Sequence, residues 1–106
     1  MPKYLFEGHY TSQGAKGIVN DGGSGRRASV EKALASLGGR LEAIYFAFGS
    51  VDVYVIADLP DNVTAAAMAL AVNQTAMAST RTIVLMTPEE VDAATKKSVA
   101  YRAPGS

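Results

Sequence analysis

Four side chains of this sequence could carry acid–base chemistry, and all four fall in segments that we predict to be strands. His9 is the only histidine, and histidine is the side chain that most readily exchanges a proton near neutral pH. Asp52 could act as a carboxylate base, with Tyr45 and Tyr54 donating hydrogen bonds to a developing oxyanion. These four residues are the candidate catalytic groups, without an assigned reaction.

Two of these groups also have a structural interpretation, which we favour. A histidine at the end of a strand, such as His9, commonly bonds a neighbouring carbonyl or carboxylate group. An aspartate beside a tight turn, such as Asp52, commonly accepts hydrogen bonds from backbone amides and holds the hairpin. For the same reason we expect Glu7 and Asp58 to be paired polar groups at strand edges rather than a catalytic pair of carboxylates.

A glycine-rich segment before a predicted helix is a candidate anion site. Successive glycine amides can surround an anion, the helix dipole favours negative charge there, and two guanidinium groups follow. The spacing matches neither the P-loop nor the Gly-x-Gly-x-x-Gly pattern. The alternative, which we favour, is a flexible break in the first helix with solvated arginines. The candidate anion-binding residues are Gly22, Gly23, Ser24, Gly25, Arg26 and Arg27.

The composition limits the class of protein. The chain has 106 residues, with ten Lys and Arg against ten Asp and Glu, so its formal net charge is zero. Without a basic excess, we expect no nucleic-acid binding. Without cysteine it can form no disulfide or thiolate nucleophile, and one histidine excludes a multi-histidine metal site within the chain. We expect a single domain over residues 1–106, no metal, and no cofactor that the sequence requires.

The apolar segments of the chain are short. The N-terminal region lacks the apolar stretch of a signal peptide, and no apolar run approaches the roughly 18 residues of a membrane span. We therefore expect no membrane association and a cytoplasmic protein.

Hydrophobic periodicity and turn residues predict a β-α-β-β-α-β order with an added C-terminal helix. The predicted strands are 3–10, 40–48, 52–59 and 80–86, and the predicted helices are 26–37, 62–78 and 88–99, with a helical turn at 15–20 and a loose tail from about 101 to 106. Gly38-Gly39 is expected to end the first helix, Asp61 to cap the second, and Thr87 with Glu90 to form a capping box. This order is the α+β, ferredoxin-like arrangement, in which two crossover helices cover one face of a four-stranded antiparallel sheet.

The other face of that sheet is expected to hold the functional site. By strand alternation, its side chains are Leu41, Ala43, Tyr45, Asp52, Tyr54, Ile56 and Asp58 from the second and third strands, Leu5, Glu7 and His9 from the first, and Thr82, Val84 and Met86 from the fourth. Such a face is too apolar to stay bare and too polar to be a plain core. We therefore expect a homo-oligomer, most simply a dimer packed sheet to sheet, with a polar pocket at its centre.

Two functional hypotheses remain open. In the first, the pocket binds a small molecule through Glu7, His9, Tyr45, Asp52 and Tyr54, with or without acid–base chemistry on it. In the second, the chain is a structural or regulatory assembly module, which in one form senses an anion through residues 22–27.

The chain resembles the GYD domain family over nearly its whole length. The resemblance rests on residues 37–61, which read LGGRLEAIYFAFGSVDVYVIADLPD, and on residues 4–8, 25–27 and 87–91. It implies a ferredoxin-like chain, similar to the dimeric α/β barrel group of small enzymes and ligand binders, and no particular activity. The Gly, Tyr, Asp cluster that names the family corresponds here to Gly49, Val51 and Asp52. Valine thus stands where the family has tyrosine, and we expect Gly49 to need a positive φ.

Overall fold

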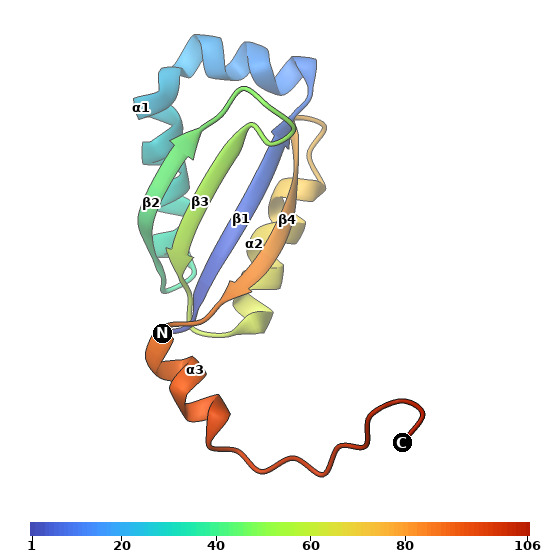
Figure 1. Cartoon of the computed structure of the whole chain (residues 1–106). Coiled ribbons are helices and arrows are strands. Elements are labelled where there is room, and N and C mark those ends of the chain that lie inside the picture. The colour runs from blue at the N-terminus through green and yellow to red at the C-terminus, as the bar shows by residue number, and fades with distance from the viewer.

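Four antiparallel strands and three helices make up the computed structural model, which describes all 106 residues (Figure 1). In chain order the elements are β1 (Lys3–Tyr10), α1 (Ser12–Ser36), β2 (Arg40–Phe46), β3 (Val53–Asp58), α2 (Asn62–Asn73), β4 (Ala78–Leu85) and α3 (Pro88–Thr95). The strand order in the sheet is β2-β3-β1-β4. The α+β, ferredoxin-like order with an added C-terminal helix is therefore confirmed, with β1 and β3 in the middle of the sheet.

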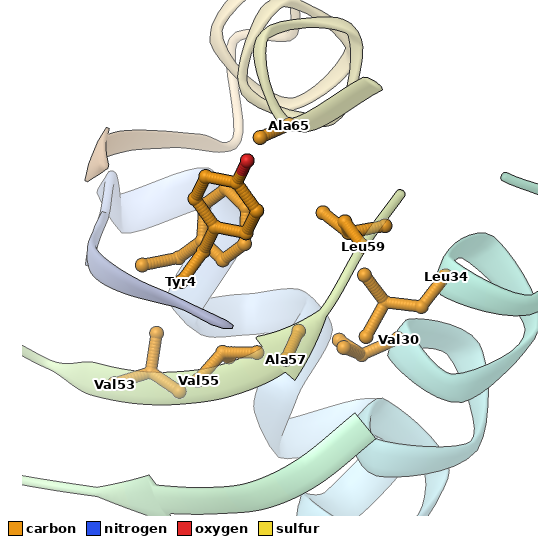
Figure 2. Close-up of a cluster of buried hydrophobic side chains, with 9 residues drawn as sticks. Tyr4, Val30, Leu34, Val53, Val55, Ala57, Leu59 and Ala65 are labelled. Carbon is orange, nitrogen blue, oxygen red and sulfur yellow. The ribbon is translucent and has the colours of Figure 1, made fainter. Parts of the chain in front are cut away.

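The hydrophobic core lies between the sheet and the two helices α1 and α2 (Figure 2). Alternate residues of β1 and β3 point into it, and α1 contributes Val30 and Leu34, which are four residues apart and lie on one side of the helix. The Tyr4 hydroxyl donates a 2.6 Å hydrogen bond to Asn62 Oδ1 and so ties β1 to α2. Only 12 of the 106 residues are buried. The accessible surface is 7242 Å², whereas a folded monomer of this size exposes roughly 5,700 Å².

The glycine-rich segment breaks the first helix, as predicted, and the break is a single residue. Two helical stretches within residues 12–36 meet at a kink, and Gly22 (φ 73°, ψ 169°) is the only residue of this range with non-helical backbone angles. Because glycine adopts a positive φ without a steric penalty, a single residue suffices to turn the helix, and no loop is needed. The kink divides α1 into two limbs, which Figure 1 shows running in different directions.

The register of the sheet corrects the predicted faces of Leu41, Thr82 and Val84. A β-bulge lies between Leu41 and Ala43, so Leu41 pairs with Ala57 on the helix-covered face while Ala43 pairs with Ile56 on the other. In β4, Thr82 and Val84 pair with Phe6 and Tyr4 and so share their helix-covered face. The uncovered face instead carries Ser79, Arg81, Ile83 and Leu85 of β4, and Met86 lies beyond the strand.

Local capping signals fix several ends of the elements. Asp61 caps α2, Thr87 and Glu90 form the complete capping box of α3, and Gly38 ends α1 with φ 76°. Helix α2 ends at Asn73 rather than near residue 78, and the Asn73 side chain accepts a 2.7 Å hydrogen bond from the Thr80 amide of β4. Helix α3 ends at Thr95, and every residue from Pro88 to Ser106 is exposed.

Candidate functional site

A row of polar side chains crosses the uncovered face of the sheet, one from each strand. Glu7 of β1 pairs with Tyr54 of β3 on one side and with Arg81 of β4 on the other, and Tyr54 pairs with Tyr45 of β2. Directly paired residues of antiparallel strands have Cβ atoms about 4.5–5.5 Å apart, so neighbours in this row are in reach of one another. None of the four side chains has a hydrogen-bond partner within the chain, and we call them the tyrosine row.

Three of the predicted ligand-binding residues, Glu7, Tyr45 and Tyr54, thus come together. Arg81 was missed because its strand carries Ile83, Val84 and Leu85 in succession, and such a run fits either face equally well. Only the pairing with β1 shows that Arg81 lies opposite Glu7.

The next row along the same face is apolar. It consists of Ala43, Ile56, Leu5 and Ile83, again one residue from each strand. Ile83 is 41% exposed, and Tyr45 in the adjacent tyrosine row is 71% exposed. We call Ala43, Ile56, Leu5 and Ile83 the apolar row; no helix of the chain covers it.

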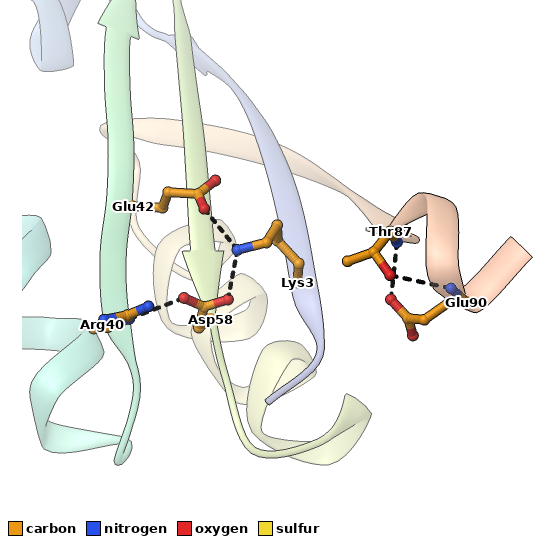
Figure 3. Close-up of polar contacts among 6 residues, drawn as sticks. All are labelled: Lys3, Arg40, Glu42, Asp58, Thr87 and Glu90. Carbon is orange, nitrogen blue, oxygen red and sulfur yellow. Dashed lines mark hydrogen bonds and ion pairs between the residues drawn. The ribbon is translucent and has the colours of Figure 1, made fainter.

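A charged cluster closes one end of this face (Figure 3). Lys3 Nζ lies 2.8 Å from Asp58 Oδ1 and 2.7 Å from Glu42 Oε1, while Arg40 Nε lies 3.0 Å from Asp58 Oδ2. Hydrogen bonds from Lys3 and then Arg40 hold the pKa of Asp58 below its ordinary value, although burial opposes them. The same carboxylates raise the pKa of Lys3. Asp58 is paired, as predicted, although it lies at the end of an inner strand, whereas Glu7 has no partner, so the same prediction is wrong for Glu7. The partners of Asp58 were not identified in the sequence, although Lys3 has the same strand parity as Leu5 and Glu7.

His9 and Asp52 lie near the opposite end of the face. Asp52 Oδ2 accepts a 2.8 Å hydrogen bond from the Tyr10 amide, and the Asp52 amide donates a 2.9 Å bond to Gly8 O. The carboxylate therefore continues the hydrogen-bond ladder between β1 and β3 past its last backbone pair. This agrees with the structural interpretation of Asp52, in which its carboxylate accepts a hydrogen bond from a backbone amide and holds the hairpin. His9 pairs with Ser79 across β1 and β4, and its side chain has no hydrogen-bond partner within the chain, so the interpretation that it bonds a neighbouring carbonyl or carboxylate group is wrong.

The residues that name the family lie in the connection between β2 and β3. Gly49 is exposed, and its φ is not positive, so the expectation that it needs a positive φ is wrong. A Cβ atom at Gly49 would meet nothing within 4 Å. The connection between β2 and β3 has six residues, more than the predicted turn, so it can reverse the direction of the chain without a residue of positive φ.

The helix-covered side contains two adjoining hollows, which sequence reasoning did not find. The inner one has a volume of about 50 Å³ and lies between the core strands and both helices; the outer one, of about 390 Å³, lies between the two limbs of α1 and α2. Arg26, Val30, Tyr10 and Met68 line both. The Arg26 Nε atom is fully buried and has no hydrogen-bond partner, the only buried side-chain nitrogen or oxygen in this condition.

The six predicted anion-binding residues are therefore not gathered around one point. Arg26 lines the two hollows, whereas Arg27 lines a shallow depression beside β2 together with Glu31 and Tyr45. Residues 22–25 line none of these three surfaces. No group of three or more His, Cys, Asp or Glu side chains comes close enough together to hold a metal ion. The helices are all too short or too polar to cross a membrane.

Comparison with known proteins assigns the family. The family model described as GYD domain matches residues 4–95, from the second residue of β1 to the last residue of α3. Neither the curated proteins nor the solved structures contain a significant match to the chain. The matched region includes all four strands and all three helices, and the chain therefore belongs to the GYD domain family.

Proposed function

We propose that the protein binds a small molecule and acts as a homo-oligomer whose chains pack through the uncovered sheet face. The observation that carries this proposal is the tyrosine row, four polar side chains without internal partners, lying beside the apolar row, of which Ile83 is exposed and the other three residues are half-buried. An apolar row of this kind favours contact with another surface. A row of hydroxyl, carboxylate and guanidinium groups favours a ligand that forms hydrogen bonds.

The surface area of the chain supports self-association. The exposed area of 7242 Å² exceeds by roughly 1,500 Å² what a compact monomer of this size shows. A stable interface needs about 800 Å² from each partner. Part of the excess comes from residues 88–106, which extend from the body and expose Val91, Val99 and Tyr101 (Figure 1). In an oligomer, both this segment and the apolar row would bury apolar surface that is exposed to water in the single chain.

The proposed pocket lies where the tyrosine row meets the facing sheet. Packing of two apolar rows against each other would exclude water from the neighbouring Glu7, Arg81, Tyr54 and Tyr45. His9, next along β1 on the same face, is the group that would exchange protons if the ligand is transformed. Asp52 would act by holding the end of β1 through the Tyr10 amide rather than as a base.

A native mass spectrum of freshly purified protein tests the proposal. We expect an oligomer that carries extra mass, and we expect Tyr54→Phe and His9→Gln to lose that mass while remaining folded. A monomer would contradict the assembly, and an oligomer that retains the bound mass in both variants would contradict the pocket.

A second candidate is a structural or regulatory assembly module without a ligand on the sheet face. The exposed C-terminal segment favours it, because such a segment can pack on a partner chain. An oligomer without extra mass, from which removal of residues 88–106 releases monomers, would support this alternative. The cytoplasmic location expected from the sequence stays a prediction, which cell fractionation would test.

A further inference from the structure

The two hollows on the helix-covered side share several lining residues and together form a mostly apolar site within a single chain. The inner cavity of about 50 Å³ is several times the roughly 10–15 Å³ that one water needs. Its apolar walls include Phe6, Val53 and Val55 from the sheet and Val30, Leu34 and Met68 from the helices. Such walls offer water few hydrogen bonds, so they favour an apolar group as occupant.

Arg26 supplies the one conspicuous polar group of this site. Its Nε is buried without an acceptor, whereas all other buried side-chain nitrogens and oxygens have partners. The three ion pairs of the chain all belong to the Lys3–Asp58 cluster, so no carboxylate of the protein pairs with Arg26. Asp21 lines the outer hollow but is not within ion-pair distance of Arg26. A buried donor without an acceptor is costly, so the site lacks one hydrogen-bond acceptor, and an anionic acceptor would match the charge of the guanidinium group.

Two glycines of α1 shape the walls around Arg26. The kink at Gly22 turns the helix, so that its first limb bends over the end of the sheet while the second carries Arg26, Val30 and Leu34 along the core. At Gly14 the first limb approaches the chain before β4 so closely that an added Cβ atom would overlap the carbonyl oxygen of Met77. The outer hollow is therefore a built feature of the helix geometry rather than a gap between loose segments.

We propose that this site binds a small organic carboxylate, whose apolar body occupies the inner cavity and whose carboxylate accepts hydrogen bonds from Arg26. A guanidinium group matches the geometry of a carboxylate and binds it through parallel N–H bonds. A phosphate fits less well, because the inner walls are apolar, the glycine amides of residues 22–25 line neither hollow, and Asp21 adds negative charge to the outer one. This site goes beyond the proposed sheet-face pocket: it lies on the opposite side of the sheet and needs no second chain.

Calorimetric titration with hexanoate tests this site, with hexanol and inorganic phosphate as probes of the two halves of the ligand. We expect hexanoate to bind the wild-type protein and to raise its unfolding midpoint by mass action, and we expect hexanol and phosphate to bind much more weakly. Loss of a charge-assisted hydrogen bond should make Arg26→Gln bind hexanoate about tenfold or more weakly. Arg27→Gln, which removes the adjacent arginine from a different surface, should bind it as the wild type does.

A second variant keeps the proposal falsifiable if Arg26→Gln folds poorly. Arg26→Met removes an unsatisfied buried donor, so the free protein should be at least as stable as the wild type, and hexanoate should no longer stabilise it. A destabilised Arg26→Met protein, equal binding of hexanol or phosphate, or equal losses in the two arginine variants would each overturn the proposal. A protein that binds hexanoate as a monomer would contradict only the sheet-face assembly and leave this site standing.

Discussion

The Lys3 ammonium group lies 2.8 Å from Asp58 Oδ1, and this contact joins the first residue of β1 to the last residue of β3. Arg40 binds the other carboxylate oxygen from β2, and Glu42 binds Lys3 from the same strand. Asp58 is only 5% exposed although it lies on the uncovered face. This end of the face is therefore satisfied within the chain, whereas the tyrosine row, further along β1, is not.

Asp58→Asn should lower the stability of the folded chain. The substitution replaces two charge-assisted hydrogen bonds by weaker ones and leaves Glu42 as the only carboxylate that pairs with Lys3. We expect the free energy of unfolding to fall by about 1–3 kcal/mol, measured by urea denaturation at pH 7. Glu42→Gln, at the more exposed end of the same cluster, serves as the control and should have the smaller effect. Equal losses in the two variants would mean that burial of Asp58 contributes nothing.

The contribution of Asp58 should also disappear in acid. Its pKa in the folded chain is lowered by hydrogen bonds from Lys3 and then Arg40, below the ordinary value of 3.8. The stabilisation is therefore fully present above pH 3.8 and is lost as the pH falls through the lower, folded pKa. Hydrogen bonds from Thr64 also lower the pKa of Asp61, but Asp61 is present in both proteins, so its contribution cancels in the comparison. The difference in unfolding free energy between wild type and Asp58→Asn should therefore shrink from pH 5 to acid conditions; a constant difference would contradict the assignment.

The parts of the fold that follow from local patterns were predictable. Strand β1 was predicted with its observed ends, and the capping box of Thr87 and Glu90 was predicted from its residue types and spacing alone. Simple alternation places Glu7, Tyr45 and Tyr54 on one face, because no bulge interrupts their strands at those positions. Residue types and strand parity thus suffice to identify every member of the tyrosine row except Arg81.

The remaining features depend on contacts between distant segments. The bulge after Leu41 and the face of Arg81 are set by pairing with β3 and β1, and the residue pattern of a single strand contains neither. The glycine-rich segment has a low helix propensity, yet it stays helical except at Gly22. The helix on either side of it is capped at Thr11 and packed on the core through Val30 and Leu34. The hollow beside Arg26 arises where both limbs of α1 meet α2, so no motif in the sequence could reveal it.

Two glycines of the first limb of α1 should respond in opposite ways to alanine. At Gly14 a Cβ atom would overlap Met77 O, a backbone atom that cannot move away without shifting β4. At Gly17 nothing lies within 4 Å. We expect Gly14→Ala to destabilise the chain by about 1–3 kcal/mol and Gly17→Ala to stabilise it by about 0.5–1 kcal/mol. Thermal unfolding of both variants checks this, and a Gly14→Ala protein as stable as the wild type would contradict the close approach.

Substitutions at Asp52 separate its two interpretations. If the carboxylate serves to continue the β1–β3 ladder, Asp52→Asn keeps an oxygen acceptor for the Tyr10 amide and should unfold much as the wild type does. Asp52→Ala removes the acceptor and should cost about 1 kcal/mol in urea denaturation. Native mass spectra of Asp52→Asn should retain any bound mass. Loss of that mass in a fully stable Asp52→Asn protein would instead favour a direct role for the carboxylate in the pocket.

Ile83→Arg should dissociate the proposed oligomer. Ile83 is 41% exposed and stands in the apolar row between Arg81 and Leu85 on the uncovered face. Two chains packed sheet to sheet would bury an arginine at this position against the apolar row of the partner chain, which costs far more than it does in a monomer. Val63→Arg is the matched control, because Val63 is also exposed but lies on α2, on the other side of the sheet. Sedimentation velocity should find Ile83→Arg as a folded monomer and Val63→Arg at the wild-type mass. If the two variants keep the same assembly, the chains associate through another surface, and the exposed segment after Pro88 becomes the region to remove next.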